Sequence, residues 1–175
     1  MAATFTASFI GATFGNNKSL ATVYNGVGSG KVIRIYRIIM LNNQTVAIAN
    51  GVITTIEIRR ITASSGGAAG LKLKHDTNSS DLNANITVTT GSTDTVSSDT
   101  YRRFLWSTDE PALTGATLDE WQCLPVFNVV WDSGYQETNL DPIVLREGEG
   151  VTIKQPGANT LGLCDIFIEF TEAST

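Results

Sequence analysis

Alternating apolar and polar side chains mark the clearest strand of this chain. In the segment from Leu163 to Glu172, one phase holds Asp165 and Glu169, and the other is apolar from Cys164 to Phe170. A repeat of two residues is typical of a strand with one face in a core and the other in water. We therefore predict a strand here, with inward side chains at Cys164, Ile166, Ile168 and Phe170.

The same repeat predicts a second strand from Val52 to Thr62. Its inward positions would be Val52, Ile56 and Ile58, and its outward positions Thr55, Glu57 and Arg59. The phase then slips, because Ile61 falls on the outward side. We therefore predict a β-bulge or a strand end at Arg59 and Arg60.

The segment from Lys31 to Leu41 is apolar in both phases. One face would hold Ile33, Ile35, Ile39 and Leu41, and the other Val32, Tyr36, Ile38 and Met40. Such a strand is typical of the centre of a sheet that is covered on both sides. We expect its second face to be covered by another part of the chain or by another subunit.

Shorter apolar runs, separated by clusters of Gly, Asn, Ser and Thr, predict further strands. They are Ser19 to Tyr24, Leu71 to Lys74, Ala84 to Thr90, Tyr101 to Trp106, Val126 to Trp131, Ile143 to Arg146 and Val151 to Lys154. Many short strands with such turns indicate an all-β fold, either an antiparallel β-sandwich or a barrel, with long polar loops. Residues 76–100 would form a polar, exposed excursion, and a capping box at 117–120 would at most add a short helix before Pro125.

Length and charge narrow the class of protein. A chain of 175 residues suits a single domain, and a net charge of −5 argues against binding to nucleic acid. No apolar run is long enough to cross a bilayer, and the first 15 residues lack the features of a secretion signal. We expect a protein that is made and kept in a cytoplasm, without a membrane partner.

A glycine-rich segment from Asn25 to Val32 is the first candidate for a nucleotide site. A phosphate-binding loop of the Walker type needs Gly, four residues, and then Gly-Lys-Ser/Thr. The first glycine position is occupied by Asn25 and the hydroxyl position by Val32, and β-branched residues follow where a helix should begin. We interpret the segment as a turn that leads into a strand.

Catalytic signals are weak. His75 is the single histidine, and the triplet Asp132-Ser133-Gly134 lacks the flanking glycines of a serine nucleophile. Four acids would be candidates for the pair that a glycosidase needs: Asp109, Glu110, Asp119 and Glu120. Scattered acids are common on an acidic surface, so we predict no catalytic residue, no cofactor and no enzymatic activity.

Ligand-binding signals leave three alternatives open. Asp76, Asn78 and Ser80 alternate like the first ligands of a calcium loop, but Asp81 and Thr87 occupy the positions that need Gly and Glu. We predict no metal site, although an irregular calcium site would remain compatible with the sequence.

The tryptophans Trp106, Trp121 and Trp131 would suit a sugar platform, a core or an interface. Cys123 and Cys164 could be free thiols or a single disulfide.

Three blocks of the sequence carry a resemblance to a protein family. They are NNKSLATVYNGVGSGKVIRIYRIIMLNNQT, IRRITASSGGAAGLKLKHDT and PIVLREGEGVTIKQPGANTLGLCDIFIEFTE. In this order, and over most of the length, the chain resembles small virion structural proteins of tailed bacteriophages. The resemblance implies a jelly-roll-like β-sandwich that works as a capsid cement or decoration protein, made in the host bacterial cytoplasm and located on the capsid surface of the virion. It implies the major capsid protein as partner and a symmetric homo-oligomer, with a trimer favoured.

Within this family we expect an N-terminal contact with the partner. Residues 1–17 would form an arm or edge strand ahead of a sandwich domain at residues 18–175. Its apolar residues Phe5, Phe9, Ile10 and Phe14 would dock on the partner by β-augmentation. The alternative function is a glycan- or receptor-binding head-fibre or tail component of the same fold, which would expose its tryptophans in a loop groove.

Overall fold

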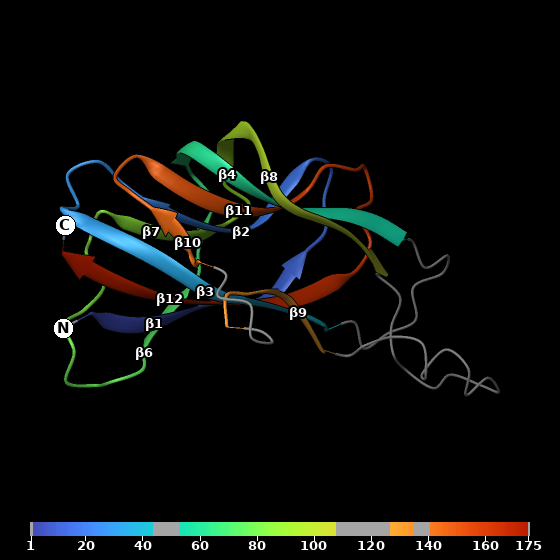
Figure 1. Ribbon diagram of the computed structural model, residues 1–175. Coiled ribbons are helices and arrows are strands. Elements are labelled where there is room, and N and C mark those ends of the chain that lie inside the picture. The colour runs from blue at the N-terminus through green and yellow to red at the C-terminus, as the bar shows by residue number, and fades with distance from the viewer. Residues whose placement is uncertain (1, 44–52, 108–126, 135–140, 175) are drawn as a thin grey trace.

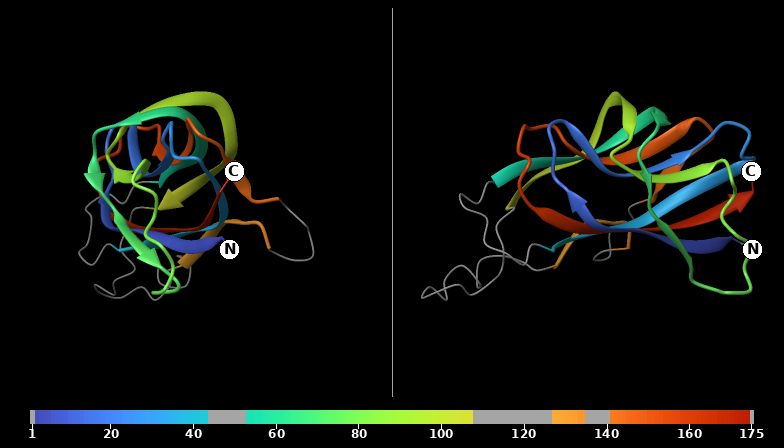
Figure 2. Two further views of the ribbon diagram at one scale, coloured as in Figure 1. Left: turned by 90° about the vertical axis from the view of Figure 1, so that its left-hand side faces the viewer. Right: turned by 180° about the vertical axis from the view of Figure 1, so that it is seen from behind.

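The computed structural model describes residues 2–43, 53–107, 127–134 and 141–174, and these form two antiparallel sheets packed face to face (Figure 1). Sheet A contains β1 (Ala3–Thr13), β3 (Lys31–Asn42), β6 (Leu71–Lys74), β9 (Phe127–Asp132), β10 (Ile143–Leu145) and β12 (Leu163–Ser174). Sheet B contains β2 (Lys18–Asn25), β4 (Ile53–Ser65), β5 (Ala68–Ala69), β7 (Ile86–Thr90), β8 (Thr93–Ser107) and β11 (Glu149–Gln155). The predicted all-β sandwich is confirmed, and the two ends of the chain lie at the same end of it (Figures 1 and 2).

The strands pair in a nested order. The first strand, β1, pairs with the last, β12, and β2 pairs with β11 in the other sheet. Continuing inward from both ends of the chain, β3 pairs with β9 and β10, and β4 pairs with β8. Folding a long antiparallel ribbon over itself in this way gives the jelly roll, in which successive strand pairs alternate between two sheets.

Inward side chains of both sheets form one core. The four inward residues predicted for β12 are buried, at 0–1% exposure, and so are Ile56 and Ile58 of β4. The predicted slip is also present, because the pairing of β4 with β8 shifts register on both sides of Arg59. Glu57 lies on the outward side of β4 as predicted, but it is buried, because Arg59 and Arg103 form ion pairs with it at 3.6 and 3.5 Å.

The prediction of an arm or edge strand at residues 1–17 holds only in part. The segment is an integral strand of the sandwich and not a separate arm, and it is an edge strand only beyond Ser8, where β6 no longer pairs with it. β1 lies between β12 and β6. Phe5, Phe9 and Phe14 are buried in the core, and the ring of Phe5 stacks on that of Phe170 with centroids 5.7 Å apart. An apolar strand beside the C-terminal strand buries these rings within its own chain, which removes the reason for an external partner.

The central strand β3 has apolar residues on both faces, but the predicted division between its faces is wrong. Tyr36 is skipped in the pairing with β12, where the register shifts between Glu169 and Phe170. This bulge reverses the phase, so Ile33 and Ile35 before it and Ile38 and Met40 after it all enter the core. Ile39 and Leu41 are left on the outer face of sheet A. The excursion predicted at 76–100 is also smaller than expected, because β7 and the start of β8 lie within it.

Candidate interaction surface

A row of apolar side chains crosses the outer face of sheet A. Register pairing joins Leu71, Ser8, Phe167, Ile39 and Val129 across the five strands β6, β1, β12, β3 and β9. Leu71 is 59% exposed and Val129 40%, whereas Phe167 and Ile39 are half-buried by their neighbours. We call the four hydrophobic residues Leu71, Phe167, Ile39 and Val129 the apolar row; Ser8, which is 4% exposed, interrupts it on β1. The outer face of an antiparallel sheet is normally polar, so four hydrophobic residues in register are unusual for a surface that faces water.

Further apolar residues extend this surface. Ile10 on β1 is 60% exposed and Leu73 on β6 is 51% exposed. Ile10 lies two residues beyond Ser8 on the same side of its strand, and Leu41 of β3 lies two residues beyond Ile39. Of the four residues predicted to bind a partner, the structure therefore leaves Ile10 alone accessible within the described chain, and it lies on this sheet face.

A row of charged residues borders the apolar row on one side. Arg37 of β3 lies between Glu169 of β12 and Asp132 of β9, which are its register partners. Its guanidinium Nε is 3.0 Å from Asp132 Oδ2, and its Nη1 is 3.7 Å from Glu169 Oε2. Apolar residues in the middle and paired charges at the rim are the composition of protein interfaces.

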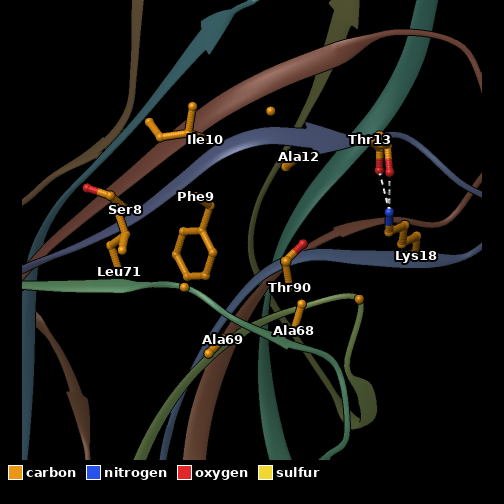
Figure 3. A pocket seen from close by; sticks show the side chains of 13 residues that line it. Ser8, Phe9, Ile10, Ala12, Thr13, Lys18, Ala68, Ala69, Leu71 and Thr90 are labelled. Atoms are coloured by element: carbon orange, nitrogen blue, oxygen red, sulfur yellow. Dashed lines mark hydrogen bonds between the residues drawn. The ribbon is translucent and has the colours of Figure 1, made fainter.

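One edge of β1, next to this face, is partly unpaired, but local features of the chain oppose the addition of another strand there. β6 pairs with β1 from Phe5 to Ser8, and beyond Ser8 no strand of the described chain pairs with that side of β1. A hollow of about 430 Å³ lies there, between residues 8–13 of β1, Lys18, residues 68–71 and residues 90–91 (Figure 3). Ser8 and Phe9 point to opposite sides of the strand at its rim (Figure 3).

Two features oppose the predicted β-augmentation at this edge. Gly11, at φ +66°, forms a bulge between Phe9 and Ala12, and its N–H donates to Asp165 Oδ1 at 2.7 Å. The ammonium of Lys18 donates to the carbonyl of Thr13 at 2.7 Å (Figure 3). Bulges and edge lysines are the devices by which natural sheets prevent strand addition. The face of sheet A is therefore a better candidate contact than its edge.

The glycine-rich loop before β3 holds an internal carboxylate. Gly28 and Gly30, both at positive φ, direct their N–H groups to Glu147, and the Gly28 nitrogen lies 3.2 Å from Oε2. The buried Asn25 fixes the loop by donating to the carbonyls of Lys31 at 2.8 Å and Leu145 at 3.2 Å. Successive glycine N–H groups form an anion-binding nest, but here the chain supplies its own anion. The segment is a turn into a strand, as predicted.

The remaining candidate groups in the described residues serve turns and ion pairs. Asp132 Oδ1 accepts from the N–H of Gly134 at 2.8 Å, and Asp76 Oδ1 accepts from the N–H of Asn78 at 2.9 Å. Asp81 pairs with Lys74 at 3.0 Å. Among the described residues, no three His, Cys, Asp or Glu side chains are grouped as metal ligands. The candidate acids at positions 109, 110, 119 and 120, the capping box at 117–120, Trp121 and Cys123 lie outside the described residues.

Of the two described tryptophans, one is buried and the other, Trp131, is half-buried against the core. Trp106 is 4% exposed. The ring of Trp131 meets Tyr101 edge-on at 6.0 Å between centroids, and the guanidinium of Arg102 lies 5.6 Å from the centroid of the Trp131 ring. Arg102 also donates to the carbonyl of Val130 at 2.9 Å, which ties β8 of sheet B to β9 of sheet A. These tryptophans close the sandwich and form no open sugar platform.

The described cysteine, Cys164, is a buried free thiol. Its Sγ lies 3.6 Å from the carbonyl oxygen of Ala12. Burial raises the pKa of the Cys164 thiol to about 12, and the nearby charge of Asp165 adds to this rise. The thiol therefore stays protonated and acts as a small apolar group of the core.

Sequence reasoning overlooked most of the apolar row. Phe167 lies in the polar phase of β12, between Asp165 and Glu169, and this break in the alternation is the signal that could have revealed it. Leu71 and Val129 carry no such signal, because the pairing of β6 with β1 and of β9 with β3 decides which way they face.

Comparison with protein-family models, curated proteins and solved structures gave no significant match to the chain. No helix of the described chain is long and apolar enough to cross a membrane. The geometry of sheet A and the charge distribution therefore carry the functional conclusion.

Proposed function

We propose that this protein is a non-enzymatic structural component of a tailed-phage virion, a cement or decoration protein that stabilises the head by binding between capsomers. The observation that supports the proposal best is the apolar row on the outer face of sheet A, bordered by paired charges. A surface of this kind is used for contact with proteins.

The physical requirements of a cement protein fit the observed fold. Such a protein adds buried interface between neighbouring subunits, so that rupture of the shell must expose the added area as well. A sandwich with most of its strands paired to two neighbours keeps its shape under load, and it needs no reaction chemistry. From the resemblance to virion structural proteins, we propose the major capsid protein as the partner and the capsid surface as the location.

The test is whether the protein is a component of phage particles and raises the temperature at which their heads rupture. Purified virions would be analysed by quantitative mass spectrometry, and recombinant protein would be added to heads that lack it. The proposal predicts a fixed copy number per head, co-sedimentation of added protein with heads, and rupture of decorated heads at a higher temperature. Absence of the chain from virions, or heads that neither bind it nor gain stability, would contradict the proposal. A glycan array with specific binding would instead favour the receptor-binding alternative.

A further inference from the structure

We propose that the hollow beside β1 binds one small aliphatic carboxylate, with its apolar chain against Ile10 and Leu71 and its carboxylate at Lys18. The hollow has a volume of about 430 Å³ and lies where the edge of sheet A meets the edge of sheet B. Sites for small molecules usually have volumes of roughly 300–1,000 Å³. The site goes beyond the proposed function and holds whether or not the chain binds phage heads.

The hollow results from the path of the chain between the two sheets. β6 pairs with β1 only as far as Ser8, and the chain before it crosses from sheet B to sheet A at Gly70. A Cβ at position 70 would lie 2.8 Å from the ring of Phe9, so glycine lets the crossing chain lie against that ring. Residues 68–69, just before the crossing, are both alanine, and they line the hollow. Their small side chains leave the gap between the two sheet edges unfilled.

One end of the hollow is aliphatic. Ile10 is 60% exposed and Leu71 is 59% exposed, and both line the hollow. Figure 3 shows them on the same side of it, with the ring of Phe9 beside them. Covering these side chains with an apolar ligand is favourable in proportion to the area removed from water.

The opposite end of the hollow offers hydrogen-bond donors. Lys18 and Thr13 lie there, away from Ile10 and Leu71 (Figure 3). The ammonium of Lys18 donates to the Thr13 carbonyl at 2.7 Å and to Thr13 Oγ1 at 2.6 Å. Its third N–H has no acceptor in the described part of the chain. Because the Thr13 hydroxyl accepts from Lys18, its own hydrogen is available to another oxygen. A carboxylate can accept from both groups.

The position of Lys18 is fixed by glycines. A Cβ at Gly15 would lie 2.8 Å from Cδ of Lys18, and a Cβ at Gly91 would lie 3.7 Å from its Cε. The stem therefore runs close to the backbone on two sides, and little side-chain freedom is lost when a ligand binds. Among the described residues that line the hollow, Lys18 alone is charged. The net charge of −5 repels anions from the chain in general, so an anion is attracted here by a local feature.

The two ends define the length of the ligand. Ile10 and Thr13 are three residues apart in β1, a distance of roughly 10 Å at the rise of a strand. A fatty acid of medium length, such as octanoate, spans this distance. An extended peptide fits less well, because the bulge at Gly11 and the lysine cap on Thr13 oppose the pairing of another strand with β1.

Isothermal titration calorimetry of the full chain with octanoate tests the site, and octanol serves as the neutral probe of the same length. We expect saturable binding of octanoate at one site per chain. Octanol should bind at least about 10-fold more weakly, because it cannot make a charge-assisted hydrogen bond with Lys18. N-acetyl-leucine stands for the carboxyl end of a protein chain. Tighter binding of N-acetyl-leucine than of octanoate would support the site and assign its ligand to a C-terminal residue.

Two variants separate the ends of the site. Ala68 pairs with Thr90, and both line the hollow, so Ala68→Phe should fill it and abolish binding of octanoate and octanol. Ala63→Phe, at an exposed alanine of β4 outside the hollow, is the matched control and should bind as wild type does. Lys18→Met should remove the preference for the carboxylate, so that octanoate and octanol bind equally. Circular dichroism checks that each variant is folded.

Three results would overturn the proposal. The first is octanoate that shows no saturable binding to the wild-type chain below the concentration at which it forms micelles. The second is octanol that binds the wild-type chain as tightly as octanoate does. The third is a folded Ala68→Phe variant with unchanged binding. None of these measurements involves phage heads, so the outcome is independent of the proposed function.

Discussion

Phe167 of β12 and Ile39 of β3 are register partners, and their side chains share the outer face of sheet A. The residue beside each of them, Ile168 in β12 and Ile38 in β3, is completely buried in the core. Ile168 and Ile38 are also register partners, and both are 0% exposed. Each of the two strands thus supplies apolar residues both to the core and to the outer face of the sheet. The inner pair stabilises the folded chain, and the outer pair is available to a partner.

Adjacent substitutions in β3 should separate these two roles. Ile38→Ala removes a fully buried side chain and should lower the free energy of unfolding by about 3 kcal/mol. Ile39→Ala should lower it by less than about 1 kcal/mol when the chain is dilute enough to be monomeric, because the side chain is only half-buried. Urea denaturation followed by circular dichroism measures both. Equal losses for the two variants would contradict the assignment of the faces.

The glycine-rich loop offers a test of backbone strain. Gly30 has φ +62°, and a Cβ built there would meet no atom within 4 Å. Gly30→Ala should therefore cost about 1 kcal/mol in the free energy of unfolding, through the left-handed backbone alone. Gly134→Ala is the matched control, since its Cβ would make an ordinary contact at 3.5 Å without a positive φ, and it should be close to neutral. Calorimetry that ranks the two in the reverse order would show that the loop conformation is not the one described.

Alternation in the sequence was sufficient for the strands that have one polar face. The inward residues of β12 and the bulge of β4 follow directly from the two-residue repeat and its slip at Arg59. The faces of β3 did not follow, because an uninterrupted apolar run carries no phase and the bulge at Tyr36 reverses the two sides.

The role of β1 was missed for a related reason. Its pattern of buried phenylalanines is the same for a strand inside a sheet and for an arm that docks on a partner. The distinction depends on the neighbours β12 and β6, which are distant in sequence. The apolar row was missed because it is assembled by pairing among five strands.

The buried thiol of Cys164 predicts a loss of stability at alkaline pH. Its pKa is about 12 in the folded chain and near the ordinary value of 9.0 in the unfolded chain, because burial disfavours the thiolate. The raised pKa means that the protonated thiol contributes to the free energy of unfolding. This contribution is complete below pH 9 and is lost as the pH rises from about 9 to 12, and the free energy of unfolding falls by at most about 1.4 kcal/mol per pH unit. Cys164→Ala should flatten the alkaline limb of the stability curve relative to wild type.

Two checks accompany this prediction. Both proteins would carry Cys123→Ser, so that Cys164 is the sole thiol under study. Burial also raises the pKa of Tyr101 above its ordinary value of 10.0, but this effect is common to both proteins and cancels in the comparison. Ellman's reagent should react with native Cys164 no faster than the chain unfolds. A rapid reaction at pH 8 would contradict its burial.

Lys18 is predicted to protect the open edge of β1. Lys18→Met removes the ammonium that caps the carbonyl of Thr13 and should accelerate aggregation on mild heating, with a small effect on the free energy of unfolding. Arg146→Met removes one positive charge from an exposed position elsewhere and serves as the control. Light scattering and thioflavin fluorescence give the rates. If both variants aggregate at the same rate, net charge and not the edge is responsible.

The most direct measurement of the central claim is an electron cryomicroscopy reconstruction of intact virions at a resolution that places individual strands. The account predicts density for this jelly roll on the outside of the head, in a regular number of copies, with the outer face of sheet A covered by another protein subunit. Particles that lack such density, or that show the apolar row of Leu71, Phe167, Ile39 and Val129 open to solvent, would contradict it.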